Sequence, residues 1–439
     1  MSKGDLLPLT RYSLLVTEAS LVRRLSILAL IIGVALLSGC GRQRTGQGTT
    51  EIVYLTRATP DQLEVWRKAT KEFMRLNPDI KVRFENLPYA QYWDKFQTMT
   101  AAGVAPDVIF MESSRFPKFV DSGALENLQP YIERDGDLDL PDFYPRALDS
   151  YRWRGDIYGL PNDIAIGVVF YNRDLFDEAG APYPKQGWTR DDYLRAAKAL
   201  TFDFDEDGRI DQFGTLIGDW RHFVWQNGGE VVDDPHRPTR STMNTPEVIE
   251  ALQWLVDLRF KHHVTTRPGE LADMGGYEMF MTGKVAMMFG GHWDVPTLSK
   301  VTRFRWDVAP LPKGKFRANN AYGSALCIPS KSRNKEAAWR YIKFLTGPEG
   351  QAIMVGSDFS TPARKSVARS KEYLTPPPDG ESVFIGEIEH GRPLPFTPKY
   401  LEMGNVTTEV MDLMWLGKRS VPDTCRELDR RIDKALSRK

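Results

Sequence analysis

Residues 51–84 read EIVYLTRATPDQLEVWRKATKEFMRLNPDIKVRF, and this stretch decides the fold class. It opens with a short β-branched and aromatic run. Thr59-Pro60-Asp61-Gln62 then provides an N-cap, a proline at the first helical position and a glutamine at N3. Apolar residues recur at three- and four-residue spacing up to Asn77-Pro78, which predicts a helix that ends there. The alternation in residues 80–84 predicts a second strand.

The pattern continues outward from this stretch. A second helix is expected at about 89–102 and a third strand at 107–111, and a β-α-β-α-β order indicates a parallel sheet with helices on both faces. Beyond Pro161, further strands are expected at 168–171, 284–289, 307–309 and 325–328, and helices at 189–200, 245–260, 335–345 and about 406–436. The chain is therefore predicted to be an α/β protein.

The N-terminal region predicts export. Arg23-Arg24 precedes the apolar run 25–37, which is too short to span a bilayer of roughly 30 Å comfortably, so residues 1–40 are interpreted as a signal peptide. Its end, Leu37-Ser38-Gly39-Cys40, resembles the bacterial lipobox, which implies that Cys40 carries the lipid. Residues 41–50 contain only Gly, Arg, Gln and Thr, with no apolar side chain to pack, and are expected to be a flexible tether.

Size, charge and cysteines bound the remaining possibilities. About 390 residues follow the tether, more than one hydrophobic core accommodates, so two lobes are expected. The chain has 58 Lys plus Arg and 58 Asp plus Glu, so it carries no excess positive charge. This balance argues against nucleic acid as a partner. A disulfide between Cys327 and Cys425 is conceivable, but two packed thiols are favoured.

Several short blocks follow one another along the chain. They include Ala105-Pro106-Asp107-Val108-Ile109-Phe110, Tyr158-Gly159-Leu160-Pro161, Tyr171-Asn172-Arg173-Asp174-Leu175-Phe176, Asn227-Gly228-Gly229 and Phe280-Met281-Thr282-Gly283-Lys284-Val285-Ala286-Met287-Met288. In this order they resemble the maltose-binding-like extracellular solute-binding proteins of bacterial ABC sugar importers. The resemblance implies a two-lobed periplasmic-binding-protein fold (type II-like), each lobe a mainly parallel sheet flanked by helices, joined by a hinge. Lobe one would comprise residues 51–162 and 321–347, and lobe two 163–320 and 348–439.

The resemblance also implies a function. The chain would capture a carbohydrate between its lobes and deliver it to the permease subunits of an ABC importer and their ATPase. It would act as a monomer, exported and held by its lipid anchor on the membrane, facing the periplasm or the cell exterior. No catalytic residue and no required cofactor are assigned.

Candidate ligand-binding residues come from three patterns. Ligands of such sheets bind beyond the carboxyl ends of the strands, and sugars need aromatic faces together with convergent donors and acceptors. The strand ends give Thr56, Arg57, Glu112, Ser113 and Ser114, and the crossings between lobes give Asn162, Asp163, Gly323 and Ser324. Second-lobe blocks give Trp220, Trp225, Asn227, Gly291, His292, Trp293 and Asp294, and the resemblance adds Arg364.

A separate acidic segment resembles the first part of an EF-hand calcium loop. Asp203, Asp205 and Asp207 alternate, Gly208 follows, and Asp211 occupies position 9, but Gly214 stands where the bidentate Glu belongs. The resemblance adds the backbone carbonyl of Arg209. A structural Ca²⁺ and a solvated acidic turn both remain open.

Two other functions stay open at this stage. The same fold could bind a non-sugar solute such as a polyamine or an anion, and Arg57 and Arg115 keep an acidic sugar possible. A secreted glycan-acting enzyme would also use aromatic residues and carboxylates. No Gly-x-Ser-x-Gly or His-Glu-x-x-His motif supports it, and His262-His263 fall near a helix end.

Overall fold

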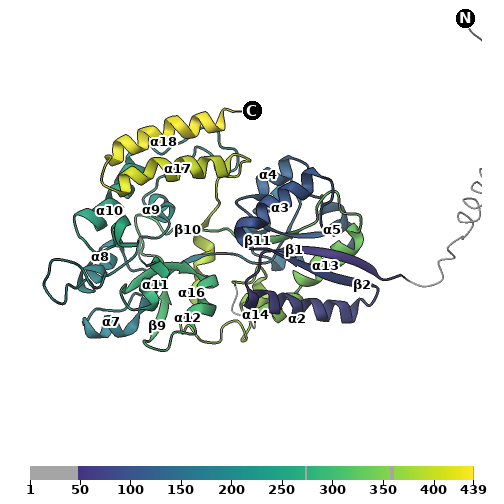
Figure 1. Cartoon of the computed structure of the whole chain (residues 1–439), viewed down its shortest axis with the longest axis horizontal. Helices are drawn as coiled ribbons and strands as arrows, with labels where there is room; N and C mark the ends of the chain where they lie inside the picture. Colours follow the sequence, from purple (N-terminus) through teal and green to yellow (C-terminus); the bar gives the residue numbers. More distant parts are fainter. Residues whose placement is uncertain (1–47, 272–273, 356–359, 439) are drawn as a thin grey trace, which may run out of the picture. The chain divides into compact units, whose positions relative to one another are not determined.

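The structure is a computed structural model that describes residues 48–271, 274–355 and 360–438 (Figure 1). The predicted signal peptide, Cys40 and the tether up to residue 47 lie outside these ranges. Within the described ranges, no helix has both the length and the apolar composition needed to cross a membrane. Residues 50–439 form one compact unit.

The first lobe is built on a five-stranded sheet with the order β2-β1-β3-β11-β6. β1 (Thr50–Thr56) pairs in parallel with both β2 (Ile80–Asn86) and β3 (Val108–Glu112), as the sequence predicted. β11 (Ser324–Cys327) returns from far along the chain and pairs antiparallel with β3 and with β6 (Leu160–Pro161). The three parallel strands therefore end at one edge of the sheet.

Helices cover both faces of this sheet. In Figure 1, α3 (Tyr89–Ala101) and α4 (Phe116–Asp121) lie on one side of β1, and α2 (Pro60–Leu76) lies on the other. The predicted capping box begins α2, because Gln62 N donates to Thr59 Oγ1 and Thr59 N donates to Gln62 Oε1. The remaining elements of this lobe are α5 (Gln129–Asp135), α6 (Pro145–Asp149), β4 (Arg152–Trp153), β5 (Asp156–Ile157), α13 (Lys335–Leu345), α14 (Pro348–Val355) and α15 (Lys365–Ala368).

The second lobe has an antiparallel sheet. β7 (Gly167–Asn172) lies between β8 (Met287–Gly291) and β9 (Trp306–Ala309) and pairs antiparallel with both. The prediction of a mainly parallel sheet is therefore wrong for this lobe. The reason is that β8 begins beside the end of β7, with Met287 opposite Tyr171, so the chain re-enters the sheet at the edge where it left. Residue periodicity predicts a strand but does not fix its direction.

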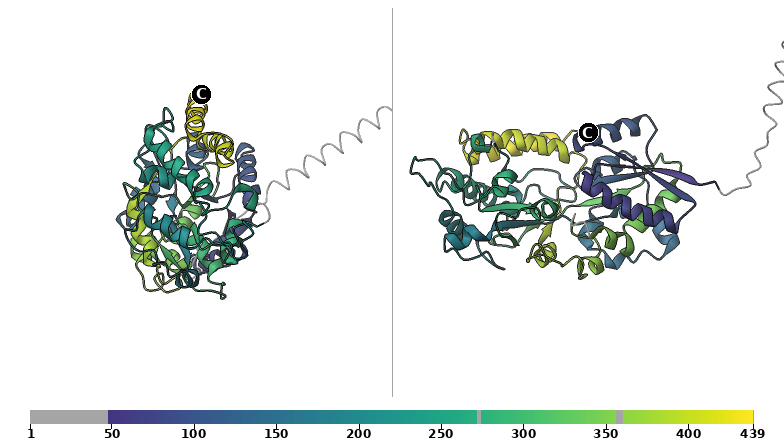
Figure 2. Two further views of the ribbon diagram at one scale, coloured as in Figure 1. Left: turned by 90° about the vertical axis from the view of Figure 1, so that its left-hand side faces the viewer. Right: turned by 60° about the horizontal axis from the view of Figure 1, so that its bottom comes forward.

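The helices of the second lobe surround this sheet. They are α7 (Arg173–Glu178), α8 (Arg190–Ala199), α9 (Trp220–Gln226), α10 (Pro246–Phe260), α11 (Gly276–Met281), α12 (Val295–Leu298), α16 (Ser382–Glu387), α17 (Tyr400–Trp415) and α18 (Val421–Leu436). The C-terminal helical region is thus two helices, which lie side by side (Figure 2). Gly417, with φ of 70°, turns the chain between them.

Three segments cross between the lobes. Residues 162–166 and 321–324 run antiparallel, with Ala165 N donating to Tyr322 O at 2.6 Å. The third crossing lies between α15 and α16, and β12 (Gly391–Arg392), which follows α16, pairs in parallel with β10 (Asn319–Asn320). The core of the first lobe also includes Met354, Ala363 and Ala368, which the predicted boundary at residue 347 placed in the second lobe.

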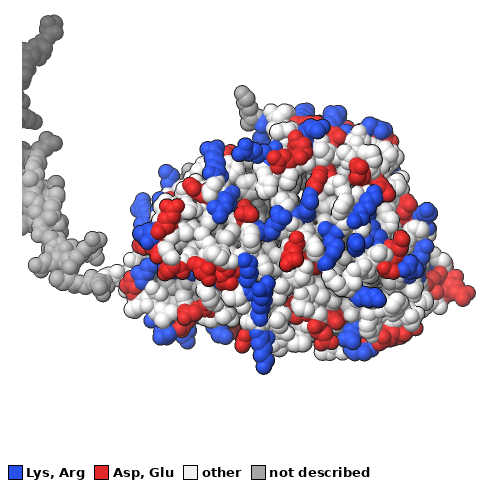
Figure 3. Space-filling view, turned by 180° about the vertical axis from the view of Figure 1, so that it is seen from behind, with Lys and Arg blue, Asp and Glu red and all other residues white. Residues whose placement is uncertain are grey.

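Two further expectations bear on the interior and the surface. Cys327 and Cys425 are buried free thiols in separate lobes, as favoured from the sequence. Basic and acidic side chains are intermixed over the face seen in Figure 3, in keeping with the balanced charge of the chain.

Candidate binding cleft

A cavity of about 580 Å³ lies between the two lobes. Both lobes and the crossing segments contribute to its wall. Eight of the residues predicted from the sequence line it: Arg57, Glu112, Ser113, Ser114, Asp163, Trp293, Gly323 and Ser324. The structure therefore brings together side chains that are up to 267 positions apart in the sequence (57 to 324).

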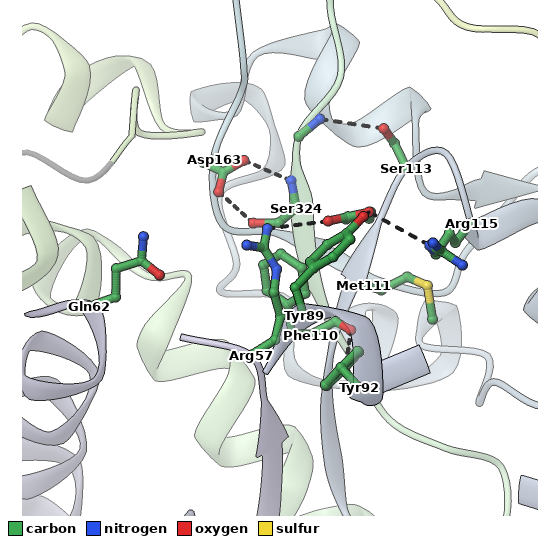
Figure 4. Close-up of polar contacts among 12 residues, drawn as sticks. Arg57, Gln62, Tyr89, Tyr92, Phe110, Met111, Ser113, Arg115, Asp163 and Ser324 are labelled. Atoms are coloured by element: carbon green, nitrogen blue, oxygen red, sulfur yellow. Dashed lines mark hydrogen bonds and ion pairs between the residues drawn. The ribbon is translucent and has the colours of Figure 1, made fainter. Parts of the chain in front are cut away.

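The first-lobe wall forms where β1 and β3 end side by side. Arg57 follows β1 and Glu112 ends β3, and Arg57 Nη2 lies 3.2 Å from Glu112 Oε1. The guanidinium carbon of Arg57 lies 5.1 Å from the ring centre of Tyr89 and 4.5 Å from that of Phe110. Tyr89 Oη donates to Glu112 Oε2 at 3.1 Å, so one carboxylate holds both neighbours (Figure 4). Arg115 approaches the same carboxylate at 3.8 Å.

The crossing segments supply a buried carboxyl group. Asp163 accepts hydrogen bonds from Ser324 N at 2.7 Å and from the Ser324 hydroxyl (Figure 4). Burial raises the pKa of Asp163, although these hydrogen bonds oppose the rise. Gly323 is required beside it, because a Cβ at this position would lie 2.5 Å from Asp163 O. The close approach of the two crossings depends on this glycine.

The second-lobe wall presents Trp293 to the cavity. Trp293 belongs to the short 3₁₀ turn His292–Asp294 that follows β8, and 39% of its surface is exposed. Its ring centre lies 6.2 Å from that of Tyr322, with 32° between the ring planes. A large aromatic face exposed inside a cavity is the feature that a sugar ring or another flat apolar surface contacts.

An ion pair of the second lobe was not predicted. Arg221 Nη1 lies 3.0 Å from both carboxylate oxygens of Asp219, and both residues line the cavity. Burial alone would raise the pKa of Asp219, but the charges of Arg221 and His222 and two hydrogen bonds outweigh it and lower the pKa. Asp219 therefore stays ionised at neutral pH. These residues flank Trp220, which was itself a candidate.

Arg364 does not line the cavity and has an internal role. It is 1% exposed, and its guanidinium donates to Thr346 O at 2.6 Å, Leu138 O at 3.0 Å and Asp142 Oδ2 at 3.2 Å. It also lies over the Phe143 ring at 4.1 Å. The expected ligand contact is therefore replaced by contacts with carbonyl oxygens and a carboxylate inside the first lobe.

Other candidates also lie outside the cavity wall. His292 is buried, with Nε2 2.6 Å from Glu381 Oε1. Asn227 donates to Glu247 O at 2.7 Å and to Glu250 Oε2 at 2.9 Å. Gly291 N donates to Asp294 Oδ2 at 3.1 Å, a contact that closes the turn carrying Trp293. Thr56 and Trp225 are buried, Trp220 packs under Arg221, and Asn162 lines a separate space of about 10 Å³.

The cavity also contains residues that sequence reasoning missed. They are Gln62, Tyr89, Phe110, Ala165, Asp219, Arg221, Tyr322, Ser360, Leu394 and Tyr400. Tyr89 and Phe110 stand at the ends of predicted elements, so the strand-end argument could have included them. Leu394 and Tyr400 follow β12, and the sequence contains no local signal for the pairing of β12 with β10.

The acidic segment forms a tight loop in the second lobe. One carboxylate oxygen from each of Asp203, Asp205 and Asp211 lies within 4.8 Å of the others. Asp203 and Asp211 also accept from backbone amides within the loop, from Gly208 N at 2.9 Å and Phe204 N at 2.8 Å. Because Ca²⁺ binds oxygen at 2.3–2.6 Å, oxygens about this far apart fit around one ion. Asp207 instead accepts from Arg209 N and does not join the group of three.

The chain matches the family model of bacterial extracellular solute-binding proteins over residues 59–352. A binding protein from Brucella abortus is 25% identical over 430 residues, which cover 93% of this chain and 98% of that protein. An arabinooligosaccharide-binding protein from Bacillus subtilis is 25% identical over 338 residues, 71% of this chain and 73% of its own. An ABC substrate-binding protein from Listeria monocytogenes, solved in complex with cycloalternan, has 27% identity and a TM-score of 0.81 over 89% of this chain and 100% of that structure. The two-lobed α/β fold and the order of the sequence blocks agree with these matches, and the chain belongs to the bacterial extracellular solute-binding protein family.

Proposed function

We propose that this chain captures a carbohydrate in the cleft between its lobes and delivers it to the permease of an ATP-driven importer. The observation that carries the proposal is the exposed ring of Trp293 on a cavity wall that also holds charged and hydroxyl groups. The name of the Bacillus relative, an arabinooligosaccharide-binding protein, and the cycloalternan complex of the Listeria relative support the same class of ligand.

The chemistry of the cleft suits a sugar. A pyranose presents C–H groups on its faces, which pack on aromatic rings, and hydroxyls at its edge, which both donate and accept hydrogen bonds. Trp293 and Tyr322 supply the rings, and Arg57, Glu112, Asp219 and Arg221 supply acceptors and donors. A cavity of about 580 Å³ falls within the size range of small-molecule sites.

Delivery to a permease requires that the bound and free forms differ. Of these four charged side chains, Arg57 and Glu112 belong to the first lobe and Asp219 and Arg221 to the second, so only an arrangement with the lobes together completes the site. A ligand that contacts both halves favours that arrangement by its differential affinity. The importer would then recognise the ligand-bound protein by the relative position of its lobes.

Binding without turnover can be tested directly. Calorimetry of the purified protein with maltotriose, cellotriose, mannotriose and galactotriose should give micromolar or tighter binding for at least one of them. Chromatography of the same mixtures should return the sugars intact. Absence of binding to these and to a wider saccharide panel contradicts the proposal, and cleavage of a sugar favours the glycan-acting alternative.

Export and anchoring are part of the same proposal. A signal peptide that ends at Cys40 would place a lipid on this residue and hold the folded part, as a monomer, on the outer side of the cell membrane. The lipoprotein description of a streptococcal relative supports this reading. Cys40→Ser should release the protein from the membrane fraction and abolish labelling with radioactive palmitate. Gel filtration should show a monomer.

The acidic loop is proposed to hold a structural Ca²⁺. Asp203, Asp205 and Asp211 would supply carboxylate oxygens, with Asp207 and the Arg209 carbonyl as further ligands. The ion would stabilise the loop, at a place separate from the residues that line the cleft.

A further inference from the structure

Each lobe contributes one arginine–carboxylate pair to the cleft. In the first lobe Arg57 Nη2 lies 3.2 Å from Glu112 Oε1, and in the second lobe Arg221 Nη1 lies 3.0 Å from both oxygens of Asp219. The four side chains are between 19% and 27% exposed. Each pair therefore presents one positive and one negative group to the cavity.

The structure holds both pairs in place. The Arg57 guanidinium lies over the rings of both Tyr89 and Phe110, and Glu112 also accepts from the Tyr89 hydroxyl. Asp219 caps α9 by accepting from Arg221 N at 3.0 Å. The carboxylates consequently cannot swing away from their arginines without losing other hydrogen bonds.

Such fixed pairs discriminate between ligands by charge. A hydroxyl both donates and accepts, so it can satisfy a carboxylate and a neighbouring guanidinium at once. A ligand carboxylate only accepts, and close to either arginine it also meets the negative charge of Glu112 or Asp219. In a partly desolvated cleft that repulsion is stronger than in water. An ammonium ligand meets the corresponding repulsion from Arg57 and Arg221.

We infer that these two pairs act as a charge filter, so that the cleft selects neutral saccharides and rejects uronic acids. Glu112 and Asp219 are then specificity-determining residues, because each carboxylate already pairs with the arginine that the carboxylate of an acidic sugar would otherwise bind. The inference rests on the proposed function, and it narrows the ligand from any carbohydrate to an uncharged one.

The test uses one sugar in two charge states. The hexose trisaccharide that binds most tightly is oxidised at its primary hydroxyls to the uronate form, and both forms are titrated into the protein at pH 7. The neutral form should bind at least about tenfold more tightly. Glu112→Gln and Asp219→Asn should each narrow this ratio, because the freed arginine can pair with the ligand carboxylate. Both substitutions preserve shape, and Asn retains the N-cap of α9.

A matched control removes the same charge from an exposed pair. Glu409, which pairs with Arg431 at 2.7 Å on the C-terminal helices, is replaced by Gln and should leave the ratio unchanged. Equal binding of both forms by the unaltered protein, or an unchanged ratio in both cleft variants, overturns the inference while leaving sugar binding intact. If no saccharide binds at all, the proposed function fails first, and the two failures are therefore distinguishable.

Discussion

Trp293 and Tyr322 form an aromatic corner of the cleft, with ring centres 6.2 Å apart and ring planes inclined by 32°. Trp293 belongs to the second lobe, whereas Tyr322 lies in a crossing segment and pairs with Ala165 of the other crossing. This aromatic surface begins at the hinge and continues on the second lobe. A sugar ring bound against it would therefore gain or lose contacts when the lobes move.

The first prediction concerns the ring of Trp293. Trp293→Ala removes the exposed aromatic face of the second-lobe wall and should weaken binding of the best trisaccharide by about 30-fold or more, roughly 2 kcal/mol. Calorimetry gives the constant. Trp293→Phe keeps a smaller ring and should lose less affinity. An unchanged constant in the alanine variant would remove this residue from the site.

Arg364 is predicted to affect stability and not affinity. Arg364→Met leaves Asp142 and several carbonyl oxygens without their buried partner, so the free energy of unfolding should fall by about 3 kcal/mol. Urea denaturation measures this fall, and calorimetry of the folded variant should give an unaltered affinity. A tenfold loss of affinity with full stability would restore Arg364 to the binding site.

The third prediction is a pH dependence at Asp294. Burial raises the pKa of this carboxyl from 3.8 to about 6, so the folded state binds more protons than the unfolded state between these values. The raised pKa stabilises the folded state, and this stabilisation is fully present below about pH 4. It is lost as the pH rises through 6.

The side chain of Asp294→Asn cannot titrate, so this variant should not lose stability as the pH rises through 6. Its stability relative to the unaltered protein should therefore rise between pH 4 and 7 by roughly 1–2 kcal/mol, a value reduced for partial exposure. Urea denaturation at several pH values provides the comparison, with Asp412→Asn on an exposed face as the control. A difference that stays constant across the range would contradict the assignment.

The acidic loop predicts a calcium-dependent melting temperature. Excess Ca²⁺ added to chelator-treated protein should raise Tm by about 2–4 °C, because the ion binds only the folded loop. Asp205→Asn should abolish the response, and Asp191→Asn, at an exposed position on α8, should preserve it. Identical Tm values with and without the ion would favour a solvated acidic turn.

Local sequence patterns predicted the ends of helices well where a single capping pair or a regular spacing of apolar residues determines them. The capping box at Thr59 and Gln62 places the start of α2, and apolar periodicity gives the bounds of α13 at Lys335 and Leu345. The strand-end rule also predicted that Arg57 and Glu112 would lie together, because β1 and β3 are parallel neighbours.

Features set by distant parts of the chain could not be predicted in this way. The direction of β8 depends on where the chain returns after α11, and the position of Leu394 depends on the pairing of β12 with β10. Charged residues were the hardest to place. Arg57, Arg221 and Arg364 look alike in sequence, and only the partners that surround each one separate a cleft residue from an internal one.

The most direct test of the account is a crystal structure of the protein with the trisaccharide that binds most tightly. We expect one sugar ring against Trp293, with hydroxyls within hydrogen-bond distance of both the Arg57–Glu112 and the Asp219–Arg221 pairs. A sugar bound elsewhere on the molecule, with this cleft filled only by water, would contradict it.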